Sequence, residues 1–108
     1  SRAPFEEFQV LVRKSLPPQF DVTLTRQMPT PGWQFVIDKV DLGDPTGKIV
    51  AHVTEVGPKG IVAQVLTDTR CTLPLGSMAT GDYSLEVWVR RGAGKDYRMV
   101  QGFTLEAR

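Results

Sequence analysis

The stretch Gly81–Arg90, with the sequence G-D-Y-S-L-E-V-W-V-R, decides the fold of this chain. Its side chains fall into two alternating sets, with Leu85, Val87 and Val89 on one side and Trp88 on the other. Successive side chains of a β-strand lie on opposite faces, so a period of two indicates a strand with one buried face. The sequence therefore predicts a fold organised around this strand.

Tyr83 stands at the head of this strand, directly after the Gly81-Asp82 turn. This arrangement resembles the tyrosine corner of immunoglobulin-like sandwiches, in which a tyrosine near the start of a late strand bonds to the chain a few residues upstream. The resemblance implies a sandwich of two sheets and a hydrogen-bond partner for the hydroxyl group of Tyr83.

Other segments repeat the period of two and are separated by glycine- and proline-rich turns. No segment shows the 3.6-residue period of an amphipathic helix, so essentially no helix is expected. We predict a single domain, residues 1–108, that forms an immunoglobulin-like antiparallel sandwich of seven to eight strands; a small β-barrel is the alternative. The further strands are expected at residues 5–14, 19–27, 33–41, 48–55, 61–66, 70–75 and 97–106.

In two of these strands, the alternation of apolar and polar side chains makes a specific prediction. In the third, Lys39 falls on the apolar side and Val40 on the other, which predicts a bulge or a strand end at this point. In the last strand, four residues are in phase and are expected to share one face: Tyr97, Met99, Phe103 and Leu105.

Charge and composition exclude several classes of function. The chain has 108 residues, 13 basic and 12 acidic side chains and a net charge of +1, which argues against nucleic acid as a partner. No apolar run reaches the roughly 18–20 residues that a membrane span requires. The single cysteine, Cys71, excludes an intrachain disulfide and a cysteine-based metal site.

The sequence contains no catalytic signature. A nucleophile needs an adjacent base, most often histidine, and the only histidine is His52 in the middle of a predicted strand. We expect His52 to face outward and Cys71 to be a small buried apolar side chain. The prediction is therefore a protein that is not an enzyme, with no catalytic residues, no cofactor and no metal.

Two charged groups offer binding chemistry. Asp38, Asp41 and Asp44 surround the turn at residues 42–47; we expect a solvated turn, with calcium binding as the alternative. Around the last hairpin, four cations stand beside one acidic residue, Asp96, which gives a local net charge of +3. The cations are Arg90, Arg91, Lys95 and Arg98. This group of cations either prevents another strand from pairing with a sheet edge or attracts an acidic partner.

Trp88 is the most informative single residue, because alternation places it on the outside of the sandwich. An exposed tryptophan is typical of binding hot spots, for a protein or a carbohydrate partner. The alternative is that a neighbouring strand, a long loop or the N-terminal segment covers it.

Three short loops, at residues 28–32, 56–60 and 91–96, are the second, fourth and sixth connections and should lie at one end of a sandwich. Their glycines and prolines suit close contact with a partner, with Trp33 anchoring the first loop from within and Thr30, Lys59 and Lys95 at the tips. Together with Trp88, the candidate binding residues are Pro29, Thr30, Pro31, Gly32, Gly57, Pro58, Lys59, Arg91, Gly92 and Lys95.

The first loop, P-T-P-G-W at residues 29–33, resembles part of the N-P-T-T-G-aromatic motif of the chagasin family of cysteine-protease inhibitors. These immunoglobulin-like domains insert three same-end loops into a protease cleft. The other two loops differ from the family, because residues 56–60 lack its G-x-G-G pattern and residues 91–96 lack its R-P-W sequence.

A longer resemblance runs from Pro29 to about Thr67. Two stretches of this segment are similar to the C-terminal domain of the PrcB family, named for a subunit of a bacterial secreted-protease complex. They are P-T-P-G-W-Q-F-V-I-D-K-V and K-I-V-A-H-V-T-E-V-G-P-K-G-I-V-A-Q-V-L-T. The resemblance implies a non-catalytic, extracytoplasmic (periplasmic or secreted) domain. The matching positions are Gly32, Trp33, Pro58, Gly60 and Gln64.

These observations predict a module that binds another protein, and the resemblance to the PrcB family implies that it assists a secreted protease complex. A protease inhibitor acting through the three loops, and a calcium- or carbohydrate-binding domain, are the alternatives. The oligomeric state and the identity of the partner stay open.

Overall fold

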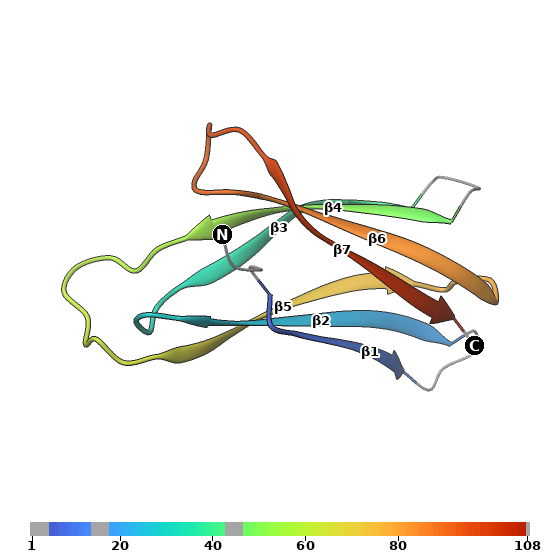
Figure 1. The fold of residues 1–108 in the computed structure, drawn as a ribbon, viewed down its shortest axis with the longest axis horizontal. Coiled ribbons are helices and arrows are strands. Elements are labelled where there is room, and N and C mark those ends of the chain that lie inside the picture. The colour runs from blue at the N-terminus through green and yellow to red at the C-terminus, as the bar shows by residue number, and fades with distance from the viewer. Residues whose placement is uncertain (1–4, 14–17, 43–46, 108) are drawn as a thin grey trace.

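The structure, a computed structural model, describes residues 5–13, 18–42 and 47–107. Its strands form a three-stranded sheet in the order β1-β2-β5 and a four-stranded sheet in the order β3-β4-β6-β7 (Figure 1). The sheets do not close on each other, so the predicted β-sandwich is confirmed and the barrel alternative is wrong. The strands are β1 (Glu7–Arg13), β2 (Gln19–Met28), β3 (Gln34–Asp41), β4 (Lys48–Val56), β5 (Thr67–Gly76), β6 (Gly81–Arg90) and β7 (Arg98–Ala107).

The described part of the chain contains no helix, and hence none long and apolar enough to cross a membrane.

The two sheets enclose one apolar core. β6 contributes Leu85, Val87 and Val89 to it, as its alternation predicted. Burying a side chain of this size stabilises the fold by about 1.5–3 kcal/mol, so the inner faces hold the sheets together. Other core residues are Val22, Leu24, Ile49, Ala51, Val53, Cys71, Leu73 and Leu75.

The centre of the four-stranded sheet departs from the expected arrangement. β4 and β6 pair in parallel, whereas the other described strand pairs are antiparallel. After β4 the chain crosses to β5 in the other sheet and returns as β6 in the original direction, which is the long connection that parallel neighbours require. The expectation of antiparallel pairing throughout does not hold at this pair. The position of β4 also differs from that in a constant-type immunoglobulin domain, where the fourth strand lies in the sheet of the first, second and fifth strands.

In the four-stranded sheet, each of the two edge strands, β3 and β7, contains a bulge that shifts its side chains. In β3 the register changes between Ile37 and Lys39, so the bulge predicted from the phase slip is confirmed, with Asp38 as its extra residue. In β7 a second shift pairs Val87 with Gln101 but Trp88 with Met99. Met99 is consequently 48% exposed and lies on the same face as Trp88. The expectation that Tyr97 and Met99 share a face with Phe103 and Leu105 is therefore wrong.

The strand expected at residues 61–66 is absent. β5 begins only at Thr67, which pairs with Met28, the last residue of β2. Beyond this pair no described strand lies beside the chain, so residues 61–66 have no ladder to join. They belong to the β4–β5 loop (residues 57–66), in which Ile61 is 102% exposed.

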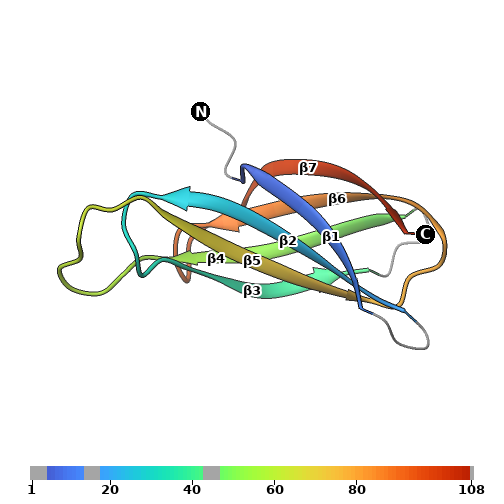
Figure 2. The ribbon, with the colours of Figure 1, turned by 90° about the horizontal axis from the view of Figure 1, so that it is seen from below.

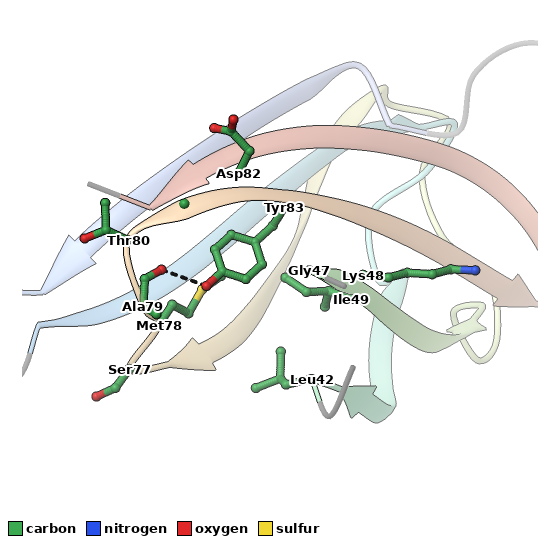
Figure 3. A pocket seen from close by; sticks show the side chains of 11 residues that line it. Leu42, Gly47, Lys48, Ile49, Ser77, Met78, Ala79, Thr80, Asp82 and Tyr83 are labelled. Atoms are coloured by element: carbon green, nitrogen blue, oxygen red, sulfur yellow. Dashed lines mark hydrogen bonds between the residues drawn. The ribbon is translucent and has the colours of Figure 1, made fainter. Parts of the chain in front are cut away.

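The tyrosine corner is present. The hydroxyl group of Tyr83 donates a hydrogen bond to the backbone carbonyl of Ala79, at 2.7 Å (Figure 3). This bond ties the start of β6 to the β5–β6 corner, residues 77–80, four residues upstream. It is the partner that the resemblance to immunoglobulin-like sandwiches implied for this hydroxyl group.

We expect Tyr83→Phe to lower the free energy of unfolding by about 1 kcal/mol, the usual net contribution of one intramolecular hydrogen bond. Urea denaturation would measure the change. Ser84→Ala, which removes an exposed hydroxyl group from the same strand, should stay within about ±0.5 kcal/mol. Equal stability of the Tyr83→Phe variant and the parent would show that the corner bond adds nothing.

Candidate functional site

The parallel register of β4 and β6 brings polar and aromatic side chains together on the outer face, the side of the four-stranded sheet that points away from β1, β2 and β5. His52 lies opposite Trp88, and Thr54 opposite Arg90. Their neighbours Val53 and Val87 point into the core, so these four side chains point outward. The ring centroids of His52 and Trp88 are 6.2 Å apart.

Asp38, at the bulge in β3, is the centre of a hydrogen-bond network on this face. Its Oδ2 atom accepts hydrogen bonds from the hydroxyl groups of Thr54 and, at 2.7 Å, Tyr97. Arg90 Nε lies 3.7 Å from the same oxygen and donates to Thr54 Oγ1 at 2.7 Å. The guanidinium carbon of Arg90 also lies 4.8 Å from the ring centroid of Tyr97, a cation–π contact. Residues from four separate segments thus fix one another's positions.

The network shifts two ionisation equilibria in opposite directions. The pKa of Asp38 lies below its ordinary value, first because Thr54 and Tyr97 donate hydrogen bonds to the carboxylate and also because Arg90 is nearby. The pKa of Tyr97 lies above its ordinary value, chiefly because its hydroxyl group donates to Asp38. The bond between Tyr97 and Asp38 contributes to both shifts, since it favours a charged carboxylate and a neutral phenol.

Trp88 is half-buried on the outer face, beside His52 and opposite Met99. Its indole Nε1 donates to Glu86 Oε1 at 3.2 Å, and Glu86 Oε2 lies 3.2 Å from Lys48 Nζ. The pKa of Glu86 is lowered, first by the hydrogen bond from Trp88 and then by the one from Lys48. The polar edge of the indole is therefore oriented, while part of its ring stays accessible.

The N-terminal segment does not cover Trp88 within the described residues. The backbone of Phe5 forms two hydrogen bonds, each of 3.2 Å, with the side-chain amide of Gln101, and its ring lies 5.3 Å from that of Phe35. Phe5 is buried in the core cluster, so it lies on the inner side of the sheet. We refer to Asp38, His52, Trp88, Arg90, Tyr97 and Met99 together as the Trp88 face.

His52 occupies the middle of the Trp88 face. Its ring meets that of Tyr97 edge-on at 4.7 Å, and its Nδ1 atom is buried with no hydrogen-bond partner among the described residues. The predicted outward orientation is confirmed. His52 and Cys71 belong to different sheets, so neither can activate the other.

Cys71 is a core side chain of the three-stranded sheet, as predicted. It is buried between apolar neighbours, and burial raises the pKa of its thiol to about 11. The thiolate, which is the reactive form, is therefore scarce at neutral pH.

Of the three predicted loops, two pack against each other. Gly32, in the β2–β3 loop (residues 29–33), has a φ of +88°, and a Cβ atom there would lie 2.8 Å from the Cβ atom of Pro58. Gly57 lies against the indole of Trp33, where a Cβ atom would be 3.4 Å away. The glycines thus allow the β2–β3 loop and the β4–β5 loop to form one packed end.

Thr30 does not lie at an exposed tip. It is 8% exposed, and its hydroxyl oxygen accepts a hydrogen bond of 2.9 Å from Trp33 Nε1. Trp33 therefore anchors the β2–β3 loop from within as expected, but with Thr30 as its partner. Thr30 is consequently a stabilising residue of the loop. Of the other candidate residues at this end, Pro29, Gly32 and Lys59 are exposed, and Pro31, Gly57 and Pro58 are half-buried.

The β6–β7 loop (residues 91–97) lies at the same end of the molecule as the other two loops (Figures 1 and 2). Figure 1 draws it above the four-stranded sheet, away from the β2–β3 loop. Tyr97 at its end bonds to Asp38, so this loop belongs with the Trp88 face. Arg91, Lys95 and Arg98 are exposed around it, and Gly92 is half-buried.

The aspartate turn gives little support to a cation site. Asp44 lies outside the described residues, and the Asp38 carboxylate is already bonded to Thr54 and Tyr97 beside Arg90. Across residues 5–13, 18–42 and 47–107, no group of three His, Cys, Asp or Glu residues is placed to hold a metal ion.

A pocket of about 480 Å³ lies between the β5–β6 corner and the start of β4 (Figure 3). Met78, Ala79 and Tyr83 line one side, and Leu42 and Ile49 the other. Its described lining contains no histidine or cysteine, and its polar side chains are those of Lys48, Ser77, Thr80, Asp82 and Tyr83.

No protein-family model, curated protein or solved structure matches this chain. The resemblances to the PrcB and chagasin families therefore stay hypotheses that rest on the quoted residues alone.

From the sequence, Trp88 and the cations of the last hairpin were predicted as candidate binding residues, but the Asp38–Thr54–Tyr97 network was not predicted. The change of phase at Lys39 was the one signal in the sequence for this network, because it predicts a bulge and a bulge redirects a side chain. The contribution of Tyr97 was hidden by the second bulge, which reverses the phase at the start of β7.

We expect the phenol of Tyr97 to titrate above the ordinary tyrosine pKa of about 10, because Asp38 favours its neutral form. The chain has two tyrosines, so ultraviolet titration of a Tyr83→Phe variant isolates Tyr97. Adding Asp38→Ala should return its pKa toward the ordinary value, whereas Asp41→Ala should not. An Asp38→Ala variant with an unchanged Tyr97 pKa would contradict the network.

We expect Cys71 in the native protein to resist thiol reagents at pH 8, because the raised pKa and burial leave little accessible thiolate. Absorbance on addition of an aromatic disulfide reagent measures the rate. The same reagent should react rapidly in concentrated guanidinium. Rapid reaction of the folded protein would show that Cys71 is accessible after all.

Proposed function

We propose that this chain is a non-catalytic protein-binding module and that the Trp88 face is its contact surface. One observation carries the proposal: Trp88, Arg90 and Tyr97 lie together on an outer sheet face and are only half-buried. Tryptophan, tyrosine and arginine are the residue types most enriched at binding hot spots.

The surrounding bonds favour this role because they order the side chains before a partner arrives. Glu86 orients Trp88, and Asp38 orients both Tyr97 and Arg90. Fixing a flexible side chain on binding costs about 0.5–1.5 kcal/mol, so side chains that are already ordered bind at lower cost. A stable fold alone does not require this arrangement on a surface.

The charge around the Trp88 face favours an acidic partner. Arg91, Lys95 and Arg98 are exposed near the β6–β7 loop, with Asp96 as the one acidic residue of that loop. Charges at the rim of an interface mainly raise the association rate, and salt screens their effect. Binding should therefore slow as ionic strength rises.

The similarity to the PrcB family directs the search for a partner to extracytoplasmic proteins, and secreted proteases are the first class to test. The alternative, a protease inhibitor, would use the packed end formed by the β2–β3 and β4–β5 loops. Because the Trp88 face and this end are separate surfaces, one mapping experiment distinguishes the two functions.

We expect amide shifts on addition of a binding protease to centre on β4, β6 and the β6–β7 loop. Trp88→Ala should weaken binding by about 2 kcal/mol or more, roughly thirtyfold, as a hot-spot residue does. Leu11→Ala, which trims an exposed apolar side chain on the three-stranded sheet, is the matched control and should bind as the parent does.

Circular dichroism must first show that the Trp88→Ala variant is folded. Shifts confined to residues 29–33 and 56–60, with the Trp88 face unaffected, would contradict the proposed surface and favour the inhibitor.

A further inference from the structure

Residues 61–66, with the sequence I-V-A-Q-V-L, are the most exposed apolar segment in the described part of the chain. Besides the fully exposed Ile61, Val65 is 57% and Leu66 66% exposed. Figures 1 and 2 show the β4–β5 loop extending past the ends of both sheets. An apolar segment without cover at the end of a fold marks a contact site.

The composition of the segment is that of a strand. It contains two valines and an isoleucine, no proline, no glycine and no charge. β-Branched residues of this kind favour extended pairing. The segment also continues directly into β5, which begins at Thr67. It lacks a neighbouring strand because β2 ends at Met28, opposite Thr67.

The edge of β5 that points away from β2 is protected against pairing with another strand, whereas residues 61–66 are not. β5 pairs only with β2 among the described strands, so its other edge has no hydrogen-bonded neighbour, and the start of β3 lies close to the start of β5 without pairing with it. Pro74 interrupts that edge because it has no N–H group, and Asp68 and Arg70 place charges on it. Proline and charge are the usual devices that prevent edge-to-edge pairing. Pairing is therefore open only at the uncharged segment before Thr67.

We propose that residues 61–66 pair antiparallel with the same segment of a second copy of this chain. A two-fold axis brings identical segments together, and an uncharged segment does so without placing like charges opposite each other. Lys59 precedes the segment and Asp68 follows it. Antiparallel pairing places the Lys59 end of one copy beside the Asp68 end of the other, which is complementary in charge.

The proposed contact is small and therefore reversible. A stable interface buries about 800 Å² on each partner, more than one six-residue strand pair provides. We expect a dimer that forms at high micromolar concentration and dissociates on dilution. Because the Trp88 face belongs to the other sheet, it remains free in both copies. The inference goes beyond the proposed function and does not depend on it.

Sedimentation equilibrium of the whole chain, from about 10 µM to 1 mM, tests the proposal. We expect a monomer–dimer equilibrium. Val65→Lys places like charges in the contact and should raise the dimer dissociation constant at least about tenfold. Leu11→Lys adds the same charge at an exposed site on β1 and should leave the equilibrium unchanged. A monomer throughout the range, or an equilibrium that Val65→Lys does not change, would overturn the proposal.

Single proline substitutions at positions 62, 63, 64 and 65 separate strand pairing from side-chain contact. Only alternate N–H groups of a strand point toward its neighbour. Prolines of one parity should therefore abolish the dimer, while those of the other parity retain it. These positions lie in a loop, and thermal unfolding would verify that each variant is folded. Equal effects at all four positions, or growth into fibrils without a discrete dimer, would refute the two-fold strand pair.

Discussion

The parallel register between β4 and β6 is the constraint on which the rest of the structure depends. It places Ala51 beside Val87 in the core and His52 beside Trp88 on the outer face. The two sets are inseparable, because a shift of one residue would turn the apolar side chains to the outside and the aromatic ones to the inside. The burial that stabilises the sandwich therefore also fixes the positions of the side chains that we assign to binding.

The two bulges complete the Trp88 face from the neighbouring strands. Without the extra residue in β3, Asp38 would not be positioned beside Thr54 and Arg90. Without the shift in β7, Met99 would not oppose Trp88. Each bulge removes a regular ladder position, which costs stability, and each one directs a side chain toward the same surface. That convergence distinguishes the Trp88 face from an ordinary solvated sheet face.

The sequence predicted the features that depend on local patterns. The alternation in β6, the bulge at Asp38 and the hydrogen bond of Tyr83 were all accessible, because each follows from a few consecutive residues. The β4–β6 pairing was not, since no local pattern states which strand lies next to which. Residues 61–66 are the opposite case, in which a local pattern predicts a strand that does not form. Their composition favours a strand, but a strand needs a neighbour, and β2 ends at Met28.

The β4–β6 register is tested most directly by backbone nuclear Overhauser effects in isotopically labelled protein. The account predicts Hα-to-amide contacts of a parallel pair that link His52 and Val53 with Trp88 and Val89. It also predicts the Hα–Hα contacts of an antiparallel pair between β3 and β4. Contacts between β3 and β6, with none between β4 and β6, would contradict it, because His52 would then be separated from Trp88 and the Trp88 face would not exist.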